Sequence, residues 1–257
     1  MVGNRPRRRW IPLWAAFGLL LPLGGSADLA LPAPTEAAWE PVEFPGVDHT
    51  EYRPAENGGV EAIARCSASG RAVRLEGLDL AETPVLRWRW WVTELAPVPA
   101  ERTKAGDDFA GRVTVMFPFE SGRASLLDRV RHEFAERLMG SEVPGTAIHF
   151  VWTHEIPAGT VWTSPRATEV KMWALAQGPA PGWQEASIDV GAAYRQAFGR
   201  SGPTPVAVAL MTDSDDHCGA SRALYANFRW TAADGDLERP TGIEPPDASS
   251  PSSSKDP

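Results

Sequence analysis

The chain has 257 residues, a net charge of −8 and an isoelectric point near 5.2, which leaves room for one large domain or two small ones. The acidic balance argues against nucleic acid as a partner, because phosphate binding requires a concentrated basic surface. Eleven tryptophans favour a packed core or a ligand surface, since indole rings bury large apolar areas and need a partner for their N–H.

Residues 1–27 have the pattern of a signal peptide. Basic residues precede the apolar run Trp10–Leu23, and the small residues Gly25, Ser26 and Ala27 suit cleavage before Asp28. An uncleaved anchor is the alternative, although the apolar run is short and interrupted by two prolines. We therefore expect a periplasmic or secreted protein with no membrane span after cleavage.

Short alternating runs separated by Gly and Pro turns follow a Pro/Ala-rich linker at residues 28–38. Such runs are typical of strands in an antiparallel sandwich. The predicted strands are Trp39–Phe44, His49–Tyr52, Val60–Ser67, Arg71–Leu75, Leu86–Val92, Arg112–Phe117, His149–Thr153, Val170–Gln177, Trp183–Val190, Val206–Thr212 and Ala223–Trp230. The sequence therefore predicts an all-β fold, an antiparallel β-sandwich, in a single domain at 39–230.

Two segments depart from this rhythm. Within an insertion at 121–147, apolar residues recur at helical spacing over 125–139, and Gly140 ends the run, which predicts one inserted surface helix. After Asp189, the letters VGAAYRQAFG predict one or two helical turns that stop at Gly199. The tail at 231–257 is rich in Asp, Pro and Ser, and we expect it to be disordered.

The stretch from Leu86 to Phe117 carries the candidate binding residues. In its first strand, Leu86, Trp88, Trp90 and Val92 share a core face, and the intervening residues face away from the core. Arginine beside tryptophan suits a sugar or an acidic sugar, because the indole stacks on the ring and the guanidinium binds hydroxyls or carboxylates. Trp183 with Glu185, and Lys171 with Trp173, are expected on polar faces too. The predicted ligand-binding residues are Arg87, Arg89, Trp91, Asp107, Asp108, Arg112 and Asp213.

A second interpretation of the same residues is structural. Asp107 or Asp108 together with Asp213 can neutralise the arginines in an internal network that needs no ligand, and Arg112 is the first candidate for this role. The run Asp213-Ser214-Asp215-Asp216 offers two further alternatives. Its acids, Asp213, Asp215 and Asp216, suit a calcium ion, or they bond their own backbone in a tight turn. No other cofactor is expected.

The only two cysteines, Cys66 and Cys218, lie beside predicted strands. A disulfide between them forms if those strands adjoin, and export would permit it. Two separate buried thiols are the alternative.

Four blocks resemble the DUF3047 family: LRWRWWV, KAGDDFAGRVTVMF, FVWTHEI and VALMTDSDDHCGASRALYANFRW. The resemblance covers roughly residues 39–230. It implies an exported or periplasmic bacterial protein with a jelly-roll or galactose-binding-like sandwich, and it implies no activity.

Three functions follow as hypotheses. The first is a non-catalytic binder of glycan or another polar envelope ligand. The second is a carbohydrate-active hydrolase or lyase that uses the loop aspartates, although common catalytic motifs such as GxSxG and HExxH are absent from the sequence. The third is an assembly factor that docks a partner protein through the helix at 125–139. The sequence predicts no oligomeric state.

Overall fold

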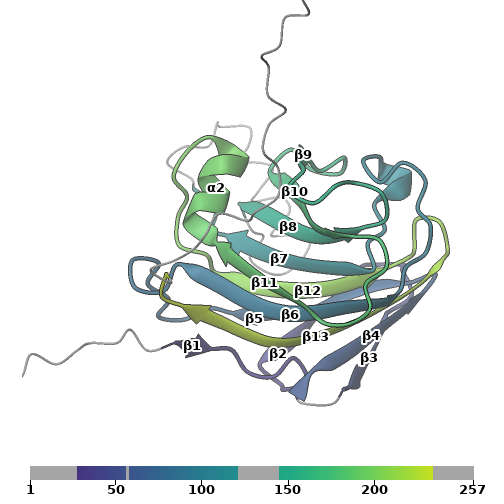
Figure 1. The fold of residues 1–257 in the computed structure, drawn as a ribbon, viewed down its shortest axis with the longest axis horizontal. Coiled ribbons are helices and arrows are strands. Elements are labelled where there is room, and N and C mark those ends of the chain that lie inside the picture. The colour runs from purple at the N-terminus through teal and green to yellow at the C-terminus, as the bar shows by residue number, and fades with distance from the viewer. Residues whose placement is uncertain (1–27, 56–57, 121–144, 234–257) are drawn as a thin grey trace, which may run out of the picture.

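Two β-sheets pack face to face to form a sandwich (Figure 1). The structure is a computed structural model, and it describes residues 28–55, 58–120 and 145–233. The predicted all-β sandwich is confirmed. The expected signal peptide, the inserted helix at 125–139 and nearly all of the tail lie outside the described residues.

Sheet A has six strands in the order β11-β6-β13-β4-β3, with β1 paired to β13. All of its strand pairs are antiparallel. Its strands are β1 (Leu29–Ala30), β3 (Glu51–Pro54), β4 (Val60–Arg65), β6 (Val85–Glu94), β11 (Gln184–Asp189) and β13 (Ala220–Thr231).

Sheet B has seven strands in the order β2-β5-β12-β7-β8-β10-β9. One pair, β8 with β10, is parallel, so the expectation of a wholly antiparallel sandwich is wrong at this point. The strands are β2 (Trp39–Glu43), β5 (Ala68–Arg74), β7 (Gly111–Phe117), β8 (Thr146–Thr153), β9 (Val161–Thr163), β10 (Val170–Gln177) and β12 (Ala207–Asp213).

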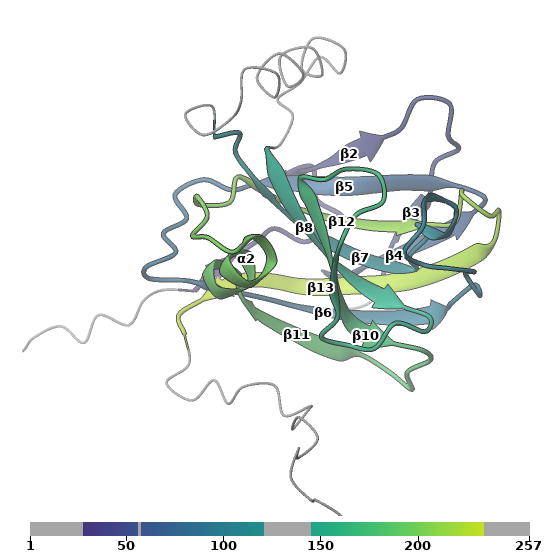
Figure 2. The ribbon, with the colours of Figure 1, turned by 90° about the horizontal axis from the view of Figure 1, so that it is seen from above.

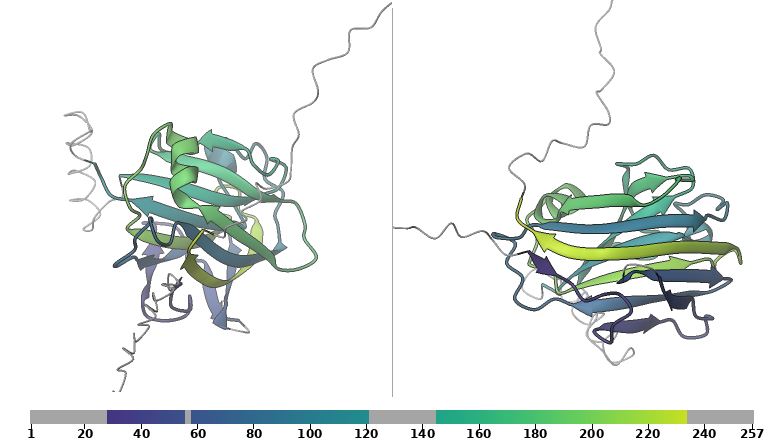
Figure 3. Two further views of the ribbon diagram at one scale, coloured as in Figure 1. Left: turned by 60° about the vertical axis from the view of Figure 1, so that its left-hand side comes forward. Right: turned by 60° about the horizontal axis from the view of Figure 1, so that its bottom comes forward.

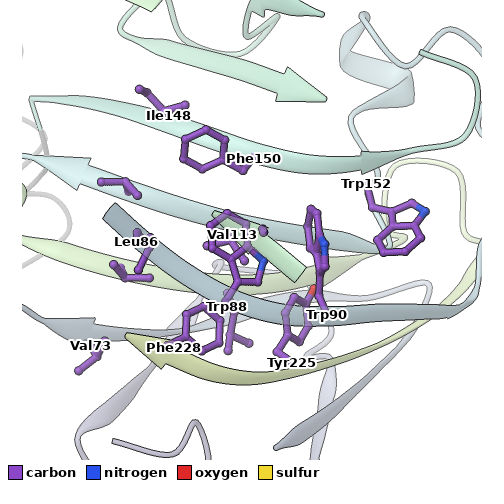
Figure 4. Close-up of a cluster of buried hydrophobic side chains, with 14 of the residues drawn as sticks. Val73, Leu86, Trp88, Trp90, Val113, Ile148, Phe150, Trp152, Tyr225 and Phe228 are labelled. Atoms are coloured by element: carbon purple, nitrogen blue, oxygen red, sulfur yellow. The ribbon is translucent and has the colours of Figure 1, made fainter. Parts of the chain in front are cut away.

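The core lies between the sheets, and tryptophans fill its centre (Figure 4). Trp88 and Trp90 from sheet A meet Phe150 and Trp152 from sheet B, with ring centroids 5.4 to 5.9 Å apart. Each of the three tryptophans is about 1% exposed, and the Nε1–H of Trp152 donates to the carbonyl of Gly178 at 2.7 Å. Alternation along β6 thus places these rings in the core, as predicted.

Two helical elements lie at opposite ends of the sandwich (Figures 1 and 2). Helix α2 (Val190–Phe198) begins at Asp189, whose carboxylate accepts from the N–H of Ala192, and ends at Gly199 with φ +70°. A short 3-10 helix (η2, Lys104–Gly106) precedes β7. In the described part of the chain, no helix combines the length and apolar character needed to cross a bilayer.

Candidate functional site

The predicted site separates into two places, because its two strands belong to different sheets. Strand β6 lies in sheet A and β7 in sheet B, and the two sheets lie face to face (Figure 3). The hydrophobic core lies between them. Arg87, Arg89 and Trp91 therefore lie on the outer face of sheet A, and Arg112 lies on the outer face of sheet B. The predicted ligand-binding residues therefore do not share one face of the molecule.

Arg112 is buried in an ionic cluster with Asp107 and Asp213. Its Nη2 donates to the carboxylate of Asp213 at 2.7 Å and to the carbonyl of Asp107 at 3.0 Å. The carboxylate of Asp107 lies 3.8 Å from the same nitrogen, and the ring of Phe109 lies 5.1 Å from the guanidinium carbon. Since the Arg112 side chain is 7% exposed, these contacts leave little of it for a ligand.

Asp108 holds the acidic loop that follows β12. Its two carboxylate oxygens accept from the backbone N–H groups of Asp216 and His217, each at 3.1 Å. The Nδ1 of His217 lies 2.9 Å from the same carboxylate, and its Nε2 lies 3.1 Å from the carbonyl of Pro97. The His217 ring thus lies between the Asp108 carboxylate and the Pro97 carbonyl, which fixes its position in the loop.

Arg166 is a member of the cluster that the sequence did not identify. It donates from Nε to Asp107 at 2.7 Å, from Nη2 to Asp216, and from Nη2 to the carbonyl of Lys104 at 3.2 Å. The two carboxylates raise the pKa of Arg166. It lies in the loop between β9 and β10, where no periodicity indicates the direction of a side chain.

The cluster holds more buried carboxylates than buried cations. Asp107, Asp108 and Asp213 are each less than 5% exposed, and Arg112 is the one buried arginine among them. Burial raises the pKa of Asp213 to about 8; Arg112 opposes this shift, and the charges of Asp107 and Asp108 add to it. Asp213 is thus harder to ionise than a solvent-exposed aspartate.

The predicted metal trio does not come together as expected. Asp213 is turned toward Arg112. Among the described residues, the three acids that lie close enough to share a cation are Asp108, Asp215 and Asp216, whose ligand atoms are within 4.8 Å of one another. The Asp216 carboxylate already accepts a hydrogen bond from Arg166, and the Asp108 carboxylate already accepts hydrogen bonds from two backbone N–H groups. Calcium binding therefore stays a prediction, and a cation there would compete with these partners.

A disulfide joins Cys66 to Cys218. Cys66 follows β4, and Cys218 lies in the acidic loop after β12. The bond ties that loop to the turn between β4 and β5, next to the residues that Asp108 holds. The cluster is thus built from loops at one end of the sandwich, with the disulfide at its edge.

The outer face of sheet A is open by comparison. The guanidinium carbon of Arg89 lies 5.2 Å from the centroid of the Trp183 ring, and its Nε lies 4.0 Å from the carboxylate of Glu185. The Nε1–H of Trp91 donates to the carbonyl of Ala180 at 3.1 Å. The side chains of Arg89 and Glu185 are 39% and 70% exposed. Trp173 differs from the prediction, because it packs against the core residue Phe150.

A pocket of about 340 Å³ lies beside the cluster. Its wall includes Glu101, whose carboxylate accepts from three successive backbone N–H groups at 2.5 to 3.2 Å. Both oxygens of Glu101 are used in this way, so its role is to hold the turn after β8. The pocket is lined by Val98, Ala100, Glu101, Arg102, Thr103, Glu155, Ile156 and Pro157.

Fold and site together define an all-β sandwich protein with one sealed ionic cluster and one open polar sheet face. The profile of the DUF3047 family, described as "Protein of unknown function", matches residues 37–229. The chain belongs to that family, as its four sequence blocks predicted. No curated protein matches the chain significantly.

Solved structures with a similar arrangement of strands include two carbohydrate-binding modules from Clostridium thermocellum. The family 11 module, in complex with a mixed-linked tetrasaccharide, is 10% identical with a TM-score of 0.39, covering 80% of this chain and 96% of that one. The family 30 module is 10% identical with a TM-score of 0.40, covering 81% and 99%.

A third similar structure is the xyloglucanase domain of NopAA from Sinorhizobium fredii, in complex with cellobiose. It is 10% identical with a TM-score of 0.40, and the match covers 75% of this chain and 91% of that one.

Proposed function

We propose that the protein is a non-catalytic glycan binder whose site is the outer face of sheet A. The Trp183 face, as we call it, consists of Arg87, Arg89, Trp91, Trp183 and Glu185. The observation that carries this proposal is the Arg89 guanidinium, held 5.2 Å above the Trp183 ring on a solvent-accessible face. The indole ring and the guanidinium group thus lie side by side on this face.

The chemistry of this face suits a sugar. An indole offers an apolar surface on which the C–H face of a pyranose can stack, and guanidinium and carboxylate groups hydrogen-bond to hydroxyls. The side chains are also held in place, since Trp91 donates to Ala180 and Arg89 lies between Trp183 and Glu185. Ordering them before a ligand arrives lowers the entropy lost on binding.

The hydrolase or lyase alternative loses the residues on which it depended. A glycosidase needs two carboxylates that reach the scissile bond from either side. Asp107, Asp108 and Asp213 are buried, and each carboxylate is held by hydrogen bonds within the cluster. The carboxylates expected to act on substrate therefore hold the loops together.

Two further expectations stay predictions. The assembly-factor hypothesis rests on the helix at 125–139, which lies outside the described residues. Export to the periplasm or medium rests on residues 1–27, also outside them. A glycan-binding role is compatible with export, where envelope polysaccharides are found.

The experiment is a polysaccharide array probed with wild-type protein, Trp183→Ala and Arg89→Ala. We expect each variant to bind its glycan roughly tenfold more weakly, because tryptophan and arginine dominate binding energies at interfaces. Arg53→Ala is the matched control, since Arg53 lies on the same sheet in an exposed pair with Glu51. Loss of folding in either site variant, or binding equal to wild type, would contradict the proposal.

A further inference from the structure

A row of outward-facing residues crosses sheet A at right angles to its strands. Strands β11, β6 and β13 lie side by side in that sheet (Figure 2), and β4 follows β13. Leu224 of β13 lies opposite Trp91 of β6 on one side and opposite Glu61 of β4 on the other. Trp183 directly precedes β11, whose first residue pairs with Trp90, so Trp183 lies at the β11 end of the same row.

The middle of this row is apolar. Ala223 and Tyr225 are fully buried, so Leu224 between them faces outward. Trp91 faces outward for the same reason, since both of its neighbours on β6 belong to the core. Neighbouring strands are about 4.8 Å apart, so a row across four strands is about 14 Å long. That length exceeds one sugar ring and suits a short run of linked rings that crosses the strands.

Each end of the row carries an ion pair. At the Trp183 end, the Nε of Arg89 lies 4.0 Å from the carboxylate of Glu185. At the other end, the Nη1 of Arg222 lies 3.5 Å from the carboxylate of Glu61, and these two side chains are 37% and 25% exposed. Both ends therefore present a cation and an anion side by side to solvent.

We propose that the ligand is a linear polysaccharide without acid groups, which lies across the strands with its rings on Trp183, Trp91 and Leu224. This inference rests on the proposed function and adds the charge and the direction of the ligand. A hydroxyl group can accept a hydrogen bond from a guanidinium and donate one to a carboxylate, so a neutral sugar can use both members of each ion pair. An acid group on the ligand would instead meet Glu185 or Glu61 beside each arginine.

The charge of the whole chain acts in the same direction. With a net charge of −8, the protein repels a polyanion at long range. Each of the two ion pairs sums to zero charge, so neither pair offsets this repulsion. A neutral polymer is not repelled, and its affinity comes from stacking on the rings and from hydrogen bonds.

The experiment measures binding of cellulose, xylan, mannan and dextran, each as its hydroxyethyl ether and as its carboxymethyl ether. The two ethers add comparable bulk, and only the carboxymethyl ether adds charge. We expect at least one hydroxyethyl form to bind and its carboxymethyl form to bind roughly fivefold more weakly, which is the size of effect that exposed charges have. Raising the salt should reduce this difference and leave binding of the hydroxyethyl form unchanged, because salt screens only the charges.

Leu224→Thr tests the direction of the row. Threonine suits a strand but offers less apolar surface, so binding of the hydroxyethyl form should weaken roughly fivefold. The matched control is Met211→Thr, which changes another half-buried apolar residue on a central strand, in sheet B. Circular dichroism of both variants checks that they are folded.

Glu185→Gln tests the role of the ion pairs. It leaves Arg89 without its carboxylate and keeps a hydrogen-bonding group, so affinity for the carboxymethyl form should rise roughly twofold to fivefold while that for the hydroxyethyl form changes little. The matched control is Glu40→Gln, which removes the same charge from an exposed position on β2 of sheet B. An equal rise in both variants would show an effect of overall charge and overturn the role of the pair.

The remaining outcomes separate this inference from the proposed function. If polygalacturonate or alginate binds more tightly than every neutral polymer and Trp183→Ala weakens it, the ligand is acidic, and only the inference falls. Binding by folded Leu224→Thr equal to that of wild type would likewise overturn the row and leave the glycan site standing. If no polymer binds folded protein, in these pairs or on the array, the proposed function falls as well.

Discussion

The arginines that face outward from the two sheets differ in what covers them. The Arg112 side chain is 7% exposed beneath Phe109 and beside two carboxylates, whereas that of Arg89 is 39% exposed beside one indole and one glutamate. Burial makes Arg112 dependent on its partners, because an unpaired buried charge is very unfavourable. Exposure leaves Arg89 able to exchange water for a ligand. The same residue type is structural on one sheet and available on the other.

Removing Arg112 should therefore destabilise the fold. We expect Arg112→Ala to lower the free energy of unfolding by about 3–5 kcal/mol, because it leaves buried carboxylates without their cation. Arg89→Ala serves as the control and should cost about 0.5 kcal/mol. Urea unfolding of both variants measures the difference, and a similar small loss for both would contradict a structural role for Arg112.

Asp213 should make stability depend on pH. Its pKa is raised in the folded protein to about 8 from an ordinary value of 3.8, so the folded state holds a proton that the unfolded state releases. The stabilisation is full below about pH 4 and is lost as pH rises toward about 8. Asp213→Asn cannot titrate and should lack this slope. Between pH 5 and pH 8 the unfolding free energy of wild type should fall while that of the variant stays level, so that the difference between them changes with pH; parallel curves would contradict the assignment.

At the scale of elements, alternation predicted which strand residues face the core but not which strands are neighbours. Strand β10 was predicted with its observed bounds, and most other strands to within a few residues. Two short strands were missed: β1 inside the expected linker and β9 inside an expected loop. These strands have two and three residues, which is too short to show an alternating pattern. Their pairing with β13 and β10 stabilises them.

The assignment of strands to the two sheets could not be predicted for a related reason. Strands β6 and β7 adjoin in sequence, but the connection between them crosses from one sheet to the other, and nothing in either run specifies the sheet. For Arg112 the sequence left both ligand binding and an ionic network open, and its contacts with Asp107 and Asp213 support the network. Arg166 had no sequence signal, since the direction of a side chain in a loop depends on tertiary contacts.

The disulfide should stabilise the end of the sandwich that holds the cluster. Cys66 and Cys218 are separated by 152 residues, and a bond across so long a stretch restricts the unfolded chain strongly. We expect the double variant Cys66→Ser, Cys218→Ser to lose about 2–5 kcal/mol of unfolding free energy. Adding a reductant to wild type should produce a similar loss but leave the double variant unchanged. Equal stability of wild type with and without reductant would show that the bond contributes nothing.

At the scale of the whole molecule, the two outer faces have separate roles. Loops seal sheet B at the cluster, and the ionic pairs there hold strands from distant parts of the chain together. On the outer face of sheet A, the side chains of Arg89 and Glu185 are solvent-accessible among the described residues. It is this surface that we propose as the glycan site.

Oxidative footprinting of the tryptophans with a bound glycan from the array tests this arrangement most directly. Trp91 and Trp183 on sheet A and Trp162 beside the cluster on sheet B are all partly exposed, so each reports on its own face. If the ligand lies on the Trp183 face, oxidation of Trp183 and Trp91 should fall on binding while oxidation of Trp162 stays constant. Protection of Trp162 with unchanged Trp183 would place the ligand on sheet B and contradict the account.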